Sequence, residues 1–292
     1  MPIIELRDVS KLYGFGDATT LALDEVNLNI ESGEFVAIMG PSGCGKSTLM
    51  NVIGLLDRST HGEYLLNGRH VARLNANQAA KIRRDTIGFI FQSSNMIPRM
   101  SVLENVALPL VYRGVSLTKR LETASSILER VGMKTREYFL PSQLSGGQIQ
   151  CAAIARALVN DPKLIIADEP TGNLDSAGSR LVMELLSEVH RMGNTVLCVT
   201  HNPELTRYAN RVIYMRDGAI LHDEQTEIGE VASSVYHSMY FTSKKTADDD
   251  IAGVSALMEA VPLPDTNPKK APPKRKPRKT AKPRKRKPGV RT

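Results

Sequence analysis

The segment EFVAIMGPSGCGKST, residues 34–48, decides how the rest of the chain is interpreted. Its first six residues, 34–39, form a short apolar run of the kind that buried parallel strands have. The next nine, 40–48, match the phosphate-loop pattern G-x-x-x-x-G-K-[ST] in full, and a helical pattern begins at Lys46. A strand, a glycine loop and a helix in this order predict backbone N–H groups that bind phosphate at a helix N-terminus.

The pattern assigns separate tasks within this loop. We expect Lys46 to contact the β- and γ-phosphates of a nucleotide and Ser47 to ligate Mg²⁺. An ordinary glycine turn is the alternative, but the preceding strand and the following helix supply the context that the motif requires. The predicted nucleotide-binding loop comprises Gly40, Pro41, Ser42, Gly43, Cys44, Gly45, Lys46, Ser47 and Thr48.

Three more short apolar segments, at 86–91, 163–167 and 195–200, predict further buried strands. A helical pattern between the last two spans 181–189, and Gly193 is placed to end that helix. This alternation of strands and helices predicts an α/β fold, a P-loop NTPase core with a mainly parallel sheet.

Two other regions predict additions to that core. Val26, Leu28 and Ile30 alternate with polar residues, which indicates an N-terminal antiparallel β subdomain. Residues 93–160 indicate an inserted α-helical subdomain, with a capping box and then an apolar stripe at helical spacing. The capping box is Ser101 with Glu104, and the stripe is Leu121, Ala124, Leu128 and Val131.

Composition indicates a soluble globular protein, with 41% hydrophobic and 24% charged residues. No apolar run approaches the roughly 20 residues of a membrane-spanning helix, and the N-terminus lacks the pattern of a signal peptide. The three cysteines show no C-x-x-C spacing, which favours reduced thiols over disulfides or zinc. We therefore expect a cytoplasmic protein.

The net charge of +7 comes from one C-terminal segment. Residues 268–292 hold 13 Lys and Arg residues and no acidic residue, and the rest of the chain has 25 basic and 31 acidic residues. We expect a partly helical extension over 225–265 and a disordered basic Pro/Lys/Arg tail over 266–292. The tail could be a solvated extension, could contact an anionic membrane surface, or could bind nucleic acid. It has no aromatic residue for base stacking, which disfavours nucleic acid.

Polar residues follow three of the predicted strands. Gln92 follows the first, Asp168 and Glu169 follow the second, and His201 follows the third. Ligands of open α/β sheets bind beyond the carboxyl ends of the strands, so these side chains should meet the phosphate loop. A lone buried His or Gln is more often structural, but this grouping favours a site.

Phosphoryl-transfer chemistry suggests a role for each of these residues. We expect Asp168 to hold Mg²⁺ through water and Glu169 to act as general base for an attacking water. His201 can donate to the γ-phosphate. Gln92 can bridge the metal or the water and would sense the γ-phosphate.

Ser145, Gly146 and Gly147 form a second glycine-rich helix entrance. No strand precedes it, so we do not expect it to reach phosphates that Lys46 of the same chain binds. In a closed twofold pair it would contact the ATP of the other copy, with a helix N-terminus aimed at the γ-phosphate. A helix cap without a ligand is the alternative for these three residues alone.

Taken together, these motifs resemble the nucleotide-binding subunit of ABC transporters. The resemblance rests on LSGGQ at 144–148, FQ at 91–92, LIIADEPTGNLD at 164–175 and TH at 200–201, together with the phosphate loop. It covers roughly residues 1–224 and implies an ATPase that uses ATP and Mg²⁺. It also implies that Tyr13 stacks on adenine, that Gln148 belongs to the trans contact, and that Asp175 lies in the loop that communicates across the dimer.

Within that family the chain looks most like the ATPases of lipoprotein release, macrolide export and cell division. Such subunits dimerise with a second copy or a paralogue and drive a separate transmembrane permease, for export or for mechanical work on the far side. This would place the chain at the inner face of the cell membrane. One departure concerns Ile149 and Cys151, which stand where the family commonly has Gln and Arg. An Arg missing from the dimer seam or a domain interface would slow hydrolysis or alter coupling.

Two alternative functions share these motifs. One is a regulatory ATPase that controls extracytoplasmic cell-wall enzymes through a membrane partner. The other is a soluble ABC-type ATPase that acts on nucleic acid. The second is disfavoured because the chain has a single nucleotide loop, no long coiled-coil arm and no cysteine-rich insert.

Overall fold

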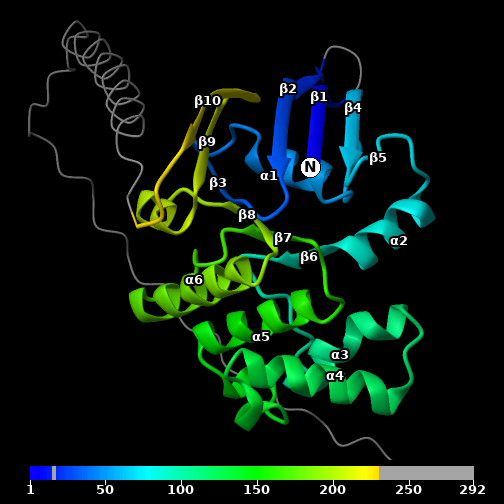
Figure 1. Ribbon diagram of the computed structural model, residues 1–292, viewed down its shortest axis with the longest axis vertical. Coiled ribbons are helices and arrows are strands. Elements are labelled where there is room, and N and C mark those ends of the chain that lie inside the picture. The colour runs from blue at the N-terminus through cyan, green and yellow to red at the C-terminus, as the bar shows by residue number, and fades with distance from the viewer. Residues whose placement is uncertain (15–17, 230–292) are drawn as a thin grey trace, which may run out of the picture. The chain divides into compact units, whose positions relative to one another are not determined.

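A six-stranded sheet carries the phosphate loop, and five of its strands are parallel (Figure 1). Its order is β10-β9-β3-β8-β7-β6, and only β10 runs antiparallel to its neighbour. The strands are β3 (Phe35–Met39), β6 (Ile87–Ile90), β7 (Leu164–Asp168), β8 (Thr195–Val199), β9 (Arg211–Arg216) and β10 (Ala219–Gln225). The predicted parallel sheet is thus confirmed.

Alternate residues of the central strands face two different cores, because side chains of a strand alternate between its faces. Val36 and Ile38 of β3 pack in a core with helix α1 (Lys46–Ile53) and the antiparallel sheet. Phe35 and Ala37 pack in a second core with helix α6 (Ser176–Arg191). Burial on both faces explains why these strands are continuously apolar.

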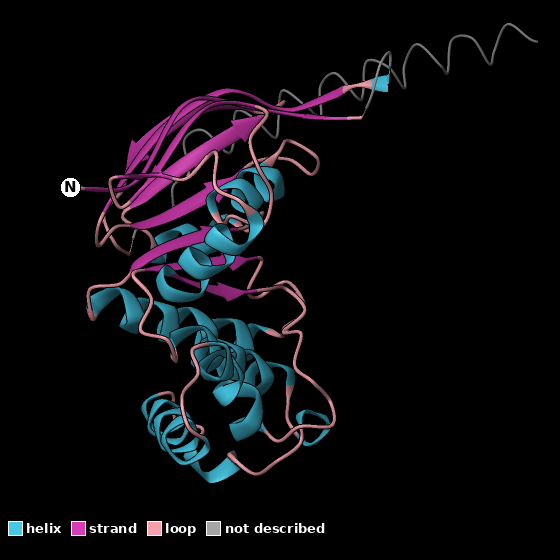
Figure 2. Ribbon diagram, turned by 90° about the vertical axis from the view of Figure 1, so that its right-hand side faces the viewer, coloured by secondary structure: helices cyan, strands magenta, loops and turns pink. Residues whose placement is uncertain are grey.

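The antiparallel sheet has the order β2-β1-β4-β5 and lies on the α1 side (Figures 1 and 2). Its strands are β1 (Pro2–Tyr13), β2 (Thr20–Glu31), β4 (His61–Leu66) and β5 (Arg69–His70). Leu6 opposes Leu28 and Val9 opposes Val26, so the alternating apolar residues face the core. The sequence predicted β2 within this sheet but not β4 or β5.

Three helices form a third core at the other side of the six-stranded sheet (Figure 2). They are α3 (Val102–Tyr112), α4 (Leu117–Arg130) and α5 (Gly146–Leu158), with short 3₁₀ turns at Lys134–Arg136 and Pro141–Gln143. Both hydrogen bonds of the predicted Ser101–Glu104 capping box form at the start of α3. Ala124 and Leu128 of the predicted stripe are buried.

The structure, a computed structural model, describes residues 1–14 and 18–229. The basic tail and the predicted extension beyond residue 229 lie outside this range. Within it, the sequence did not predict three elements. They are helix α2 (Ala76–Thr86), the 3₁₀ segment Pro203–Tyr208 and the β9–β10 hairpin. Within residues 1–14 and 18–229, none of the helices has the length and hydrophobicity of a membrane span.

Candidate active site

The phosphate loop connects β3 to α1 and holds Lys46 in a buried position. Its ammonium donates hydrogen bonds of 2.7 Å to the backbone carbonyls of Gly40 and Pro41. The Lys46 Nζ atom also lies 3.7 Å from Cys44 Sγ, whose side chain is buried. The loop's own carbonyls thus pair with the ammonium group, and a bound phosphate would replace them.

Glycine is required at two positions of the loop. Gly45 caps the N-terminus of α1 with a φ of 101°, and a Cβ there would lie 2.5 Å from the carbonyl oxygen of Ala22. Gly40 has a φ of 150°, and a Cβ there would lie 2.2 Å from the carbonyl oxygen of Met215. The loop therefore packs directly on the backbones of β2 and β9, which only glycine allows.

Glu169 and His201 form a hydrogen-bonded pair beyond the ends of β7 and β8. His201 Nδ1 lies 2.7 Å from Glu169 Oε2. Glu169 adopts a φ of 45°, and its backbone N–H donates to the Val199 carbonyl at 2.9 Å. A non-glycine residue in the left-handed region costs about 1–3 kcal/mol, and such residues are found in turns and at active sites. This backbone directs the carboxylate toward the histidine.

A cavity of about 760 Å³ joins the phosphate loop to these residues. Its lining includes Lys46 and Ser47 of the loop together with Gln92, Glu169 and His201. The side chain of Gln92 also packs against Gly172, where a Cβ would lie 2.7 Å from the amide nitrogen. The strand ends thus bring Gln92, Glu169 and His201 to the phosphate loop, as their sequence positions predicted.

Several lining residues carry no motif and were missed. They come from the start of β2 and from the turn between β9 and β10, which closes on the loop through a 3.0 Å bond from Gly218 N–H to the Cys44 carbonyl. The Asp-Gly pair of that turn is a hairpin signal in the sequence. The missed lining residues are Thr20, Leu21, Ala22, Asp217 and Gly218.

Asp168 is the last residue of β7 and is half-buried. Burial raises the pKa of its carboxyl group, the neighbouring charge of Glu169 raises it further, and Lys46 partly opposes both. Two adjacent carboxylates with one nearby ammonium leave a local excess of negative charge. A divalent cation would relieve it, so the donor set fits the predicted Mg²⁺ site of Asp168, Ser47 and Gln92.

The second glycine-rich helix entrance, Ser145 to Gly147, does not line the cavity. Ser145 caps α5, with its hydroxyl accepting from Gln148 N–H at 3.4 Å and the Gln148 side chain accepting from Ser145 N–H at 3.1 Å. Ser145 and Gly146 are exposed to solvent. Gly147 approaches Gly178 at the start of α6, where a Cβ would lie 3.2 Å from Gly178 Cα.

Asp175 and Tyr13 also lie outside the lining of the cavity. Asp175 caps α6 by accepting from Gly178 N–H at 2.8 Å, beside the α5 entrance. Tyr13 ends β1, is 41% exposed and donates its hydroxyl hydrogen to Asp57 at 2.9 Å.

Cys151 lies in the helical core rather than at a surface. Its side chain is 3% exposed and packs in the cluster of α3, α4 and α5, where burial raises the pKa of the thiol to about 11. Ile149 is half-buried on the first turn of the same helix. In this chain the departure at 151 is therefore a packing feature.

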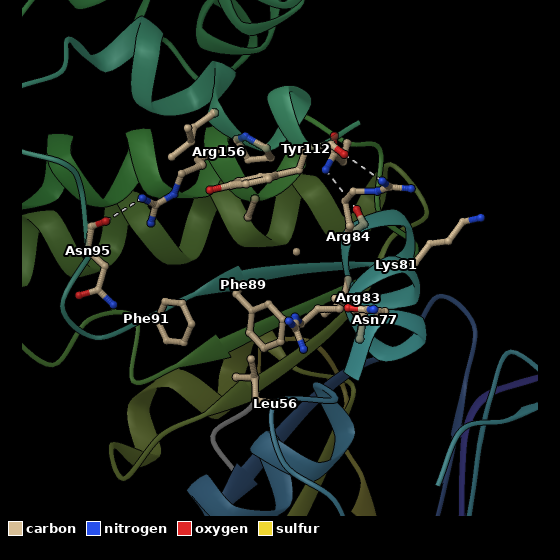
Figure 3. Close-up of a pocket in the computed structure, with 17 residues that line it drawn as sticks. Leu56, Asn77, Lys81, Arg83, Arg84, Phe89, Phe91, Asn95, Tyr112 and Arg156 are labelled. Atoms are coloured by element: carbon tan, nitrogen blue, oxygen red, sulfur yellow. Dashed lines mark hydrogen bonds between the residues drawn. The ribbon is translucent and has the colours of Figure 1, made fainter. Parts of the chain in front are cut away.

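A second cavity of about 760 Å³ lies between α2, β6 and α3 (Figure 3). The rings of Phe89 and Phe91 stack in it with centroids 5.6 Å apart, and Tyr112 lies across from them. Arg156 closes one end by donating to the Asn95 carbonyl at 2.8 Å. Asn160 lines the cavity, and its buried Oδ1 atom has no hydrogen-bond partner among the described residues.

Parallel strands that deliver a loop lysine and a Glu–His pair to one cavity define a P-loop nucleoside triphosphatase. A family model described as "ABC transporter" matches residues 23–172. The "uncharacterized ABC transporter ATP-binding protein YvrO" of Bacillus subtilis is 46% identical over 77% of this chain and 99% of its own length. The chain therefore belongs to the ABC transporter family, as an ATP-binding subunit with the ATPase domain of that family.

Two further comparisons bear on assembly. The "macrolide export ATP-binding/permease protein MacB" of Hyphomonas neptunium is 50% identical over 222 residues, which are 76% of this chain and 34% of that protein. This chain thus spans about a third of that relative. The dimeric ATP-binding cassette MJ0796, solved in a post-hydrolysis state with ADP and Pi, has 44% identity and a TM-score of 0.70 over 76% of this chain and 98% of that one.

Proposed function

We propose that two copies of this chain, or one copy and a paralogue, close around two ATP molecules and drive a separate membrane permease. The exposed Ser145–Gly146 helix entrance, which lies outside the cavity of its own phosphate loop, is the observation that carries this proposal. The dimeric state of MJ0796 and the permease part named in MacB support the two partners. By analogy with MacB, the transport direction is export.

The chain's residues divide the chemistry of hydrolysis among them. Lys46 leaves the carbonyls of Gly40 and Pro41 and binds the β- and γ-phosphates. Glu169 removes the proton of the attacking water, and His201 holds that carboxylate in place and donates to the γ-phosphate. Gln92 orients the water and links the γ-phosphate to the segment that follows it.

Asp168, Ser47 and Gln92 would hold Mg²⁺. When bound, the ion would neutralise charge on the phosphates and on the Asp168–Glu169 pair. Asp168 follows directly from a buried strand, so its carboxylate is held on a rigid support.

The start of α5 supplies the contact between copies. Ser145 and Gly146 are exposed, and the N-terminus of α5 is a ready donor for an anion. Neither residue lines the cavity of its own chain, so the γ-phosphate that they bind belongs to the other copy. Asp175 lies beside this entrance and contacts the partner in the same seam.

The aromatic cavity between α2, β6 and α3 is where we place the permease. A cytoplasmic segment of the permease with an apolar face would cover Phe89, Phe91 and Tyr112. A donor group on that segment would satisfy Asn160 Oδ1. The cavity also borders the segment after Gln92, so the permease could sense the nucleotide through it.

A disulfide cross-link tests this placement. With Tyr112→Cys, a single cysteine introduced into a cytoplasmic loop of the purified permease should form a disulfide. The same loop cysteine should not cross-link to Leu221→Cys on exposed strand β10. Equal cross-linking at both positions would contradict the placement.

The location of the chain in the cell follows from the proposed permease partner and from the basic tail. We place the chain at the cytoplasmic face of the membrane through its permease. The 13 basic residues of 268–292 add attraction to an anionic leaflet, worth about 1 kcal/mol per residue near the surface.

Glu169→Gln tests the catalytic assignment. We expect hydrolysis to fall about 10²–10⁴-fold, the usual effect of losing a general base, while ATP binding persists. Turnover and equilibrium binding of ATP measure the two effects separately. Glu63→Gln on exposed strand β4 is the control, and full turnover by Glu169→Gln would remove this residue from the role.

A further inference from the structure

Three side chains form a cluster beside the nucleotide cavity. Lys11 of β1 donates to Asp57 Oδ1 at 2.7 Å and to the Arg58 carbonyl at 2.8 Å. Tyr13 donates its hydroxyl hydrogen to the other carboxylate oxygen of Asp57 at 2.9 Å. Asp57 thus accepts from both residues at once, across 44 and 46 positions of sequence.

The cluster is partly buried and its charges are paired. The side chain of Lys11 is 11% exposed and that of Asp57 is 35% exposed. Burial alone would raise the pKa of Asp57, but the hydrogen bonds from Lys11, the Arg58 N–H and Tyr13 outweigh it and lower that pKa. Asp57 therefore stays ionised and holds both donors.

The ammonium group also covers one face of the Tyr13 ring. Lys11 Nζ lies 4.7 Å from the ring centroid, which is within the range of a cation–π contact. Tyr13 nevertheless remains 41% exposed, so ring surface is available to a planar ligand. Its hydroxyl also interacts with the side chain of Thr48, which lines the nucleotide cavity.

Asp57, which holds the Tyr13 ring, follows the helix that begins in the phosphate loop. Helix α1 begins in the phosphate loop at Lys46 and ends at Ile53, and Asp57 lies in the turn that follows. That turn is closed by bonds from Leu56 N–H and Asp57 N–H to the Asn51 carbonyl. The distance between the ring and the phosphate loop is therefore fixed through one short helix.

We infer that Lys11 and Asp57 are positioning residues that hold the Tyr13 ring ready to stack on the nucleobase. This inference rests on the proposed function, with Tyr13 as the adenine contact that the family resemblance implies. A ring held by two partners loses little conformational freedom when the base arrives, so the gain in affinity comes from preorganisation. The side-chain hydrogen bonds of Lys11 and Asp57 go to each other, to Tyr13 and to Arg58 rather than to the phosphate loop.

Binding of Mg-ADP and of inorganic tripolyphosphate tests the inference. Asp57→Asn and Tyr13→Phe should each weaken Mg-ADP binding about three- to tenfold, because the ring remains but its orientation is no longer held. Tripolyphosphate, which has no base, should bind as tightly as before. In steady-state hydrolysis of ATP, KM should rise by the same factor with kcat nearly unchanged. The double variant should lose no more than the larger of the two single effects, since both substitutions act on the same Tyr13–Asp57 hydrogen bond.

Asp223→Asn is the matched control. Asp223 also pairs with a partly buried basic residue, Arg211, and its side chain is 36% exposed, close to the value for Asp57. It lies on β10 and does not line the nucleotide cavity, so its variant should bind both ligands normally. Unchanged Mg-ADP affinity in Asp57→Asn would overturn the inference, and so would an equal loss for tripolyphosphate.

Tyr13→Ala separates failure of the inference from failure of the proposed base contact. Loss of base stacking should weaken Mg-ADP binding about tenfold or more. If Tyr13→Ala weakens binding and Asp57→Asn does not, the ring stacks without needing its anchor. If neither variant weakens binding, Tyr13 does not contact the base at all.

Discussion

Asp168 and Glu169 are neighbours in the chain but experience different surroundings. Asp168 continues the buried strand β7, whereas the left-handed backbone of Glu169 turns its side chain toward His201. Burial and the adjacent charge raise the pKa of Asp168, so its ionised form destabilises the nucleotide-free protein. Without a bound cation, the ionised Asp168 carboxylate beside Glu169 lowers the stability of the folded protein.

Asp168→Asn should therefore stabilise the nucleotide-free protein at neutral pH. Because the pKa of Asp168 is higher in the folded than in the unfolded state, its contribution to stability is fully present below the unfolded pKa and lost as the pH rises through the folded pKa. The melting temperature of the variant should exceed that of the original chain by about 2–4 °C at pH 7, as expected for about 1 kcal/mol. The gap should close near pH 4, which thermal melts at several pH values would reveal.

Asp24→Asn at an exposed position of β2 provides the comparison for this measurement, because it removes an acidic charge from the surface. If Asp168→Asn is no more stable than the original chain at pH 7, the destabilisation assigned to the ionised Asp168 carboxylate is wrong.

At the scale of residues, the sequence predicted the parts of the site that follow a strand end. Gln92, Glu169 and His201 reach the cavity because parallel strands end at one edge. Asp217 and Lys11 could not be predicted, because each acts through contact with a distant segment. The pairing of Lys11 with Asp57 spans 46 positions and has no local signal.

Among the elements, those with caps and strong periodicity were predictable. Helix α6 ends where expected, with Gly193 in the left-handed region at φ 98°. Helix α2 was missed because none of its residues is buried, so it has no apolar stripe to reveal it. Strand β9 pairs with β3 across a long stretch of sequence, and only the Asp-Gly turn after it marks its position.

Helix α3 holds the segment that follows Gln92 through one buried side chain. Asn105 is fully buried, and its Oδ1 accepts from Ile97 N–H at 2.7 Å. Its amide donates to the carbonyls of Ile97, Met100 and Ser101 at 3.0–3.1 Å. These bonds connect the helical core to the segment that follows Gln92 and helps to position it.

Asn105→Ala should lower the free energy of unfolding by about 2–3 kcal/mol, since buried groups lose their partners. Turnover should fall as well, because the segment after Gln92 is no longer held, while Mg-ADP affinity should persist. Urea unfolding and steady-state kinetics measure these effects. Asn29→Ala at an exposed position of β2 should change neither quantity, and a stable, fully active Asn105→Ala variant would refute this role.

For the whole molecule, the basic segment 268–292 should add membrane affinity. Flotation of the full chain with vesicles should succeed when they contain phosphatidylglycerol and fail when they contain phosphatidylcholine alone. Replacing the 13 basic residues of the segment with Gln should abolish flotation. Binding that ignores lipid charge would argue that the segment is a solvated extension.

Closure of two copies around ATP is the central claim at this scale. It depends on two observations. Ser145 and Gly146 are exposed, and neither residue lines the nucleotide cavity of its own chain. Sequence predicted the separation because no strand precedes Ser145, but the packing of α5 against α6 at Gly147 and Gly178 required the structure.

The most direct test is the mass of Glu169→Gln in sedimentation equilibrium, with and without Mg-ATP. We predict that Mg-ATP doubles the mass, that Mg-ADP does not, and that adding Ser145→Arg to the same variant keeps it monomeric. A Glu169→Gln protein that binds ATP and remains monomeric, or one that dimerises equally well with Ser145→Arg, would contradict the account.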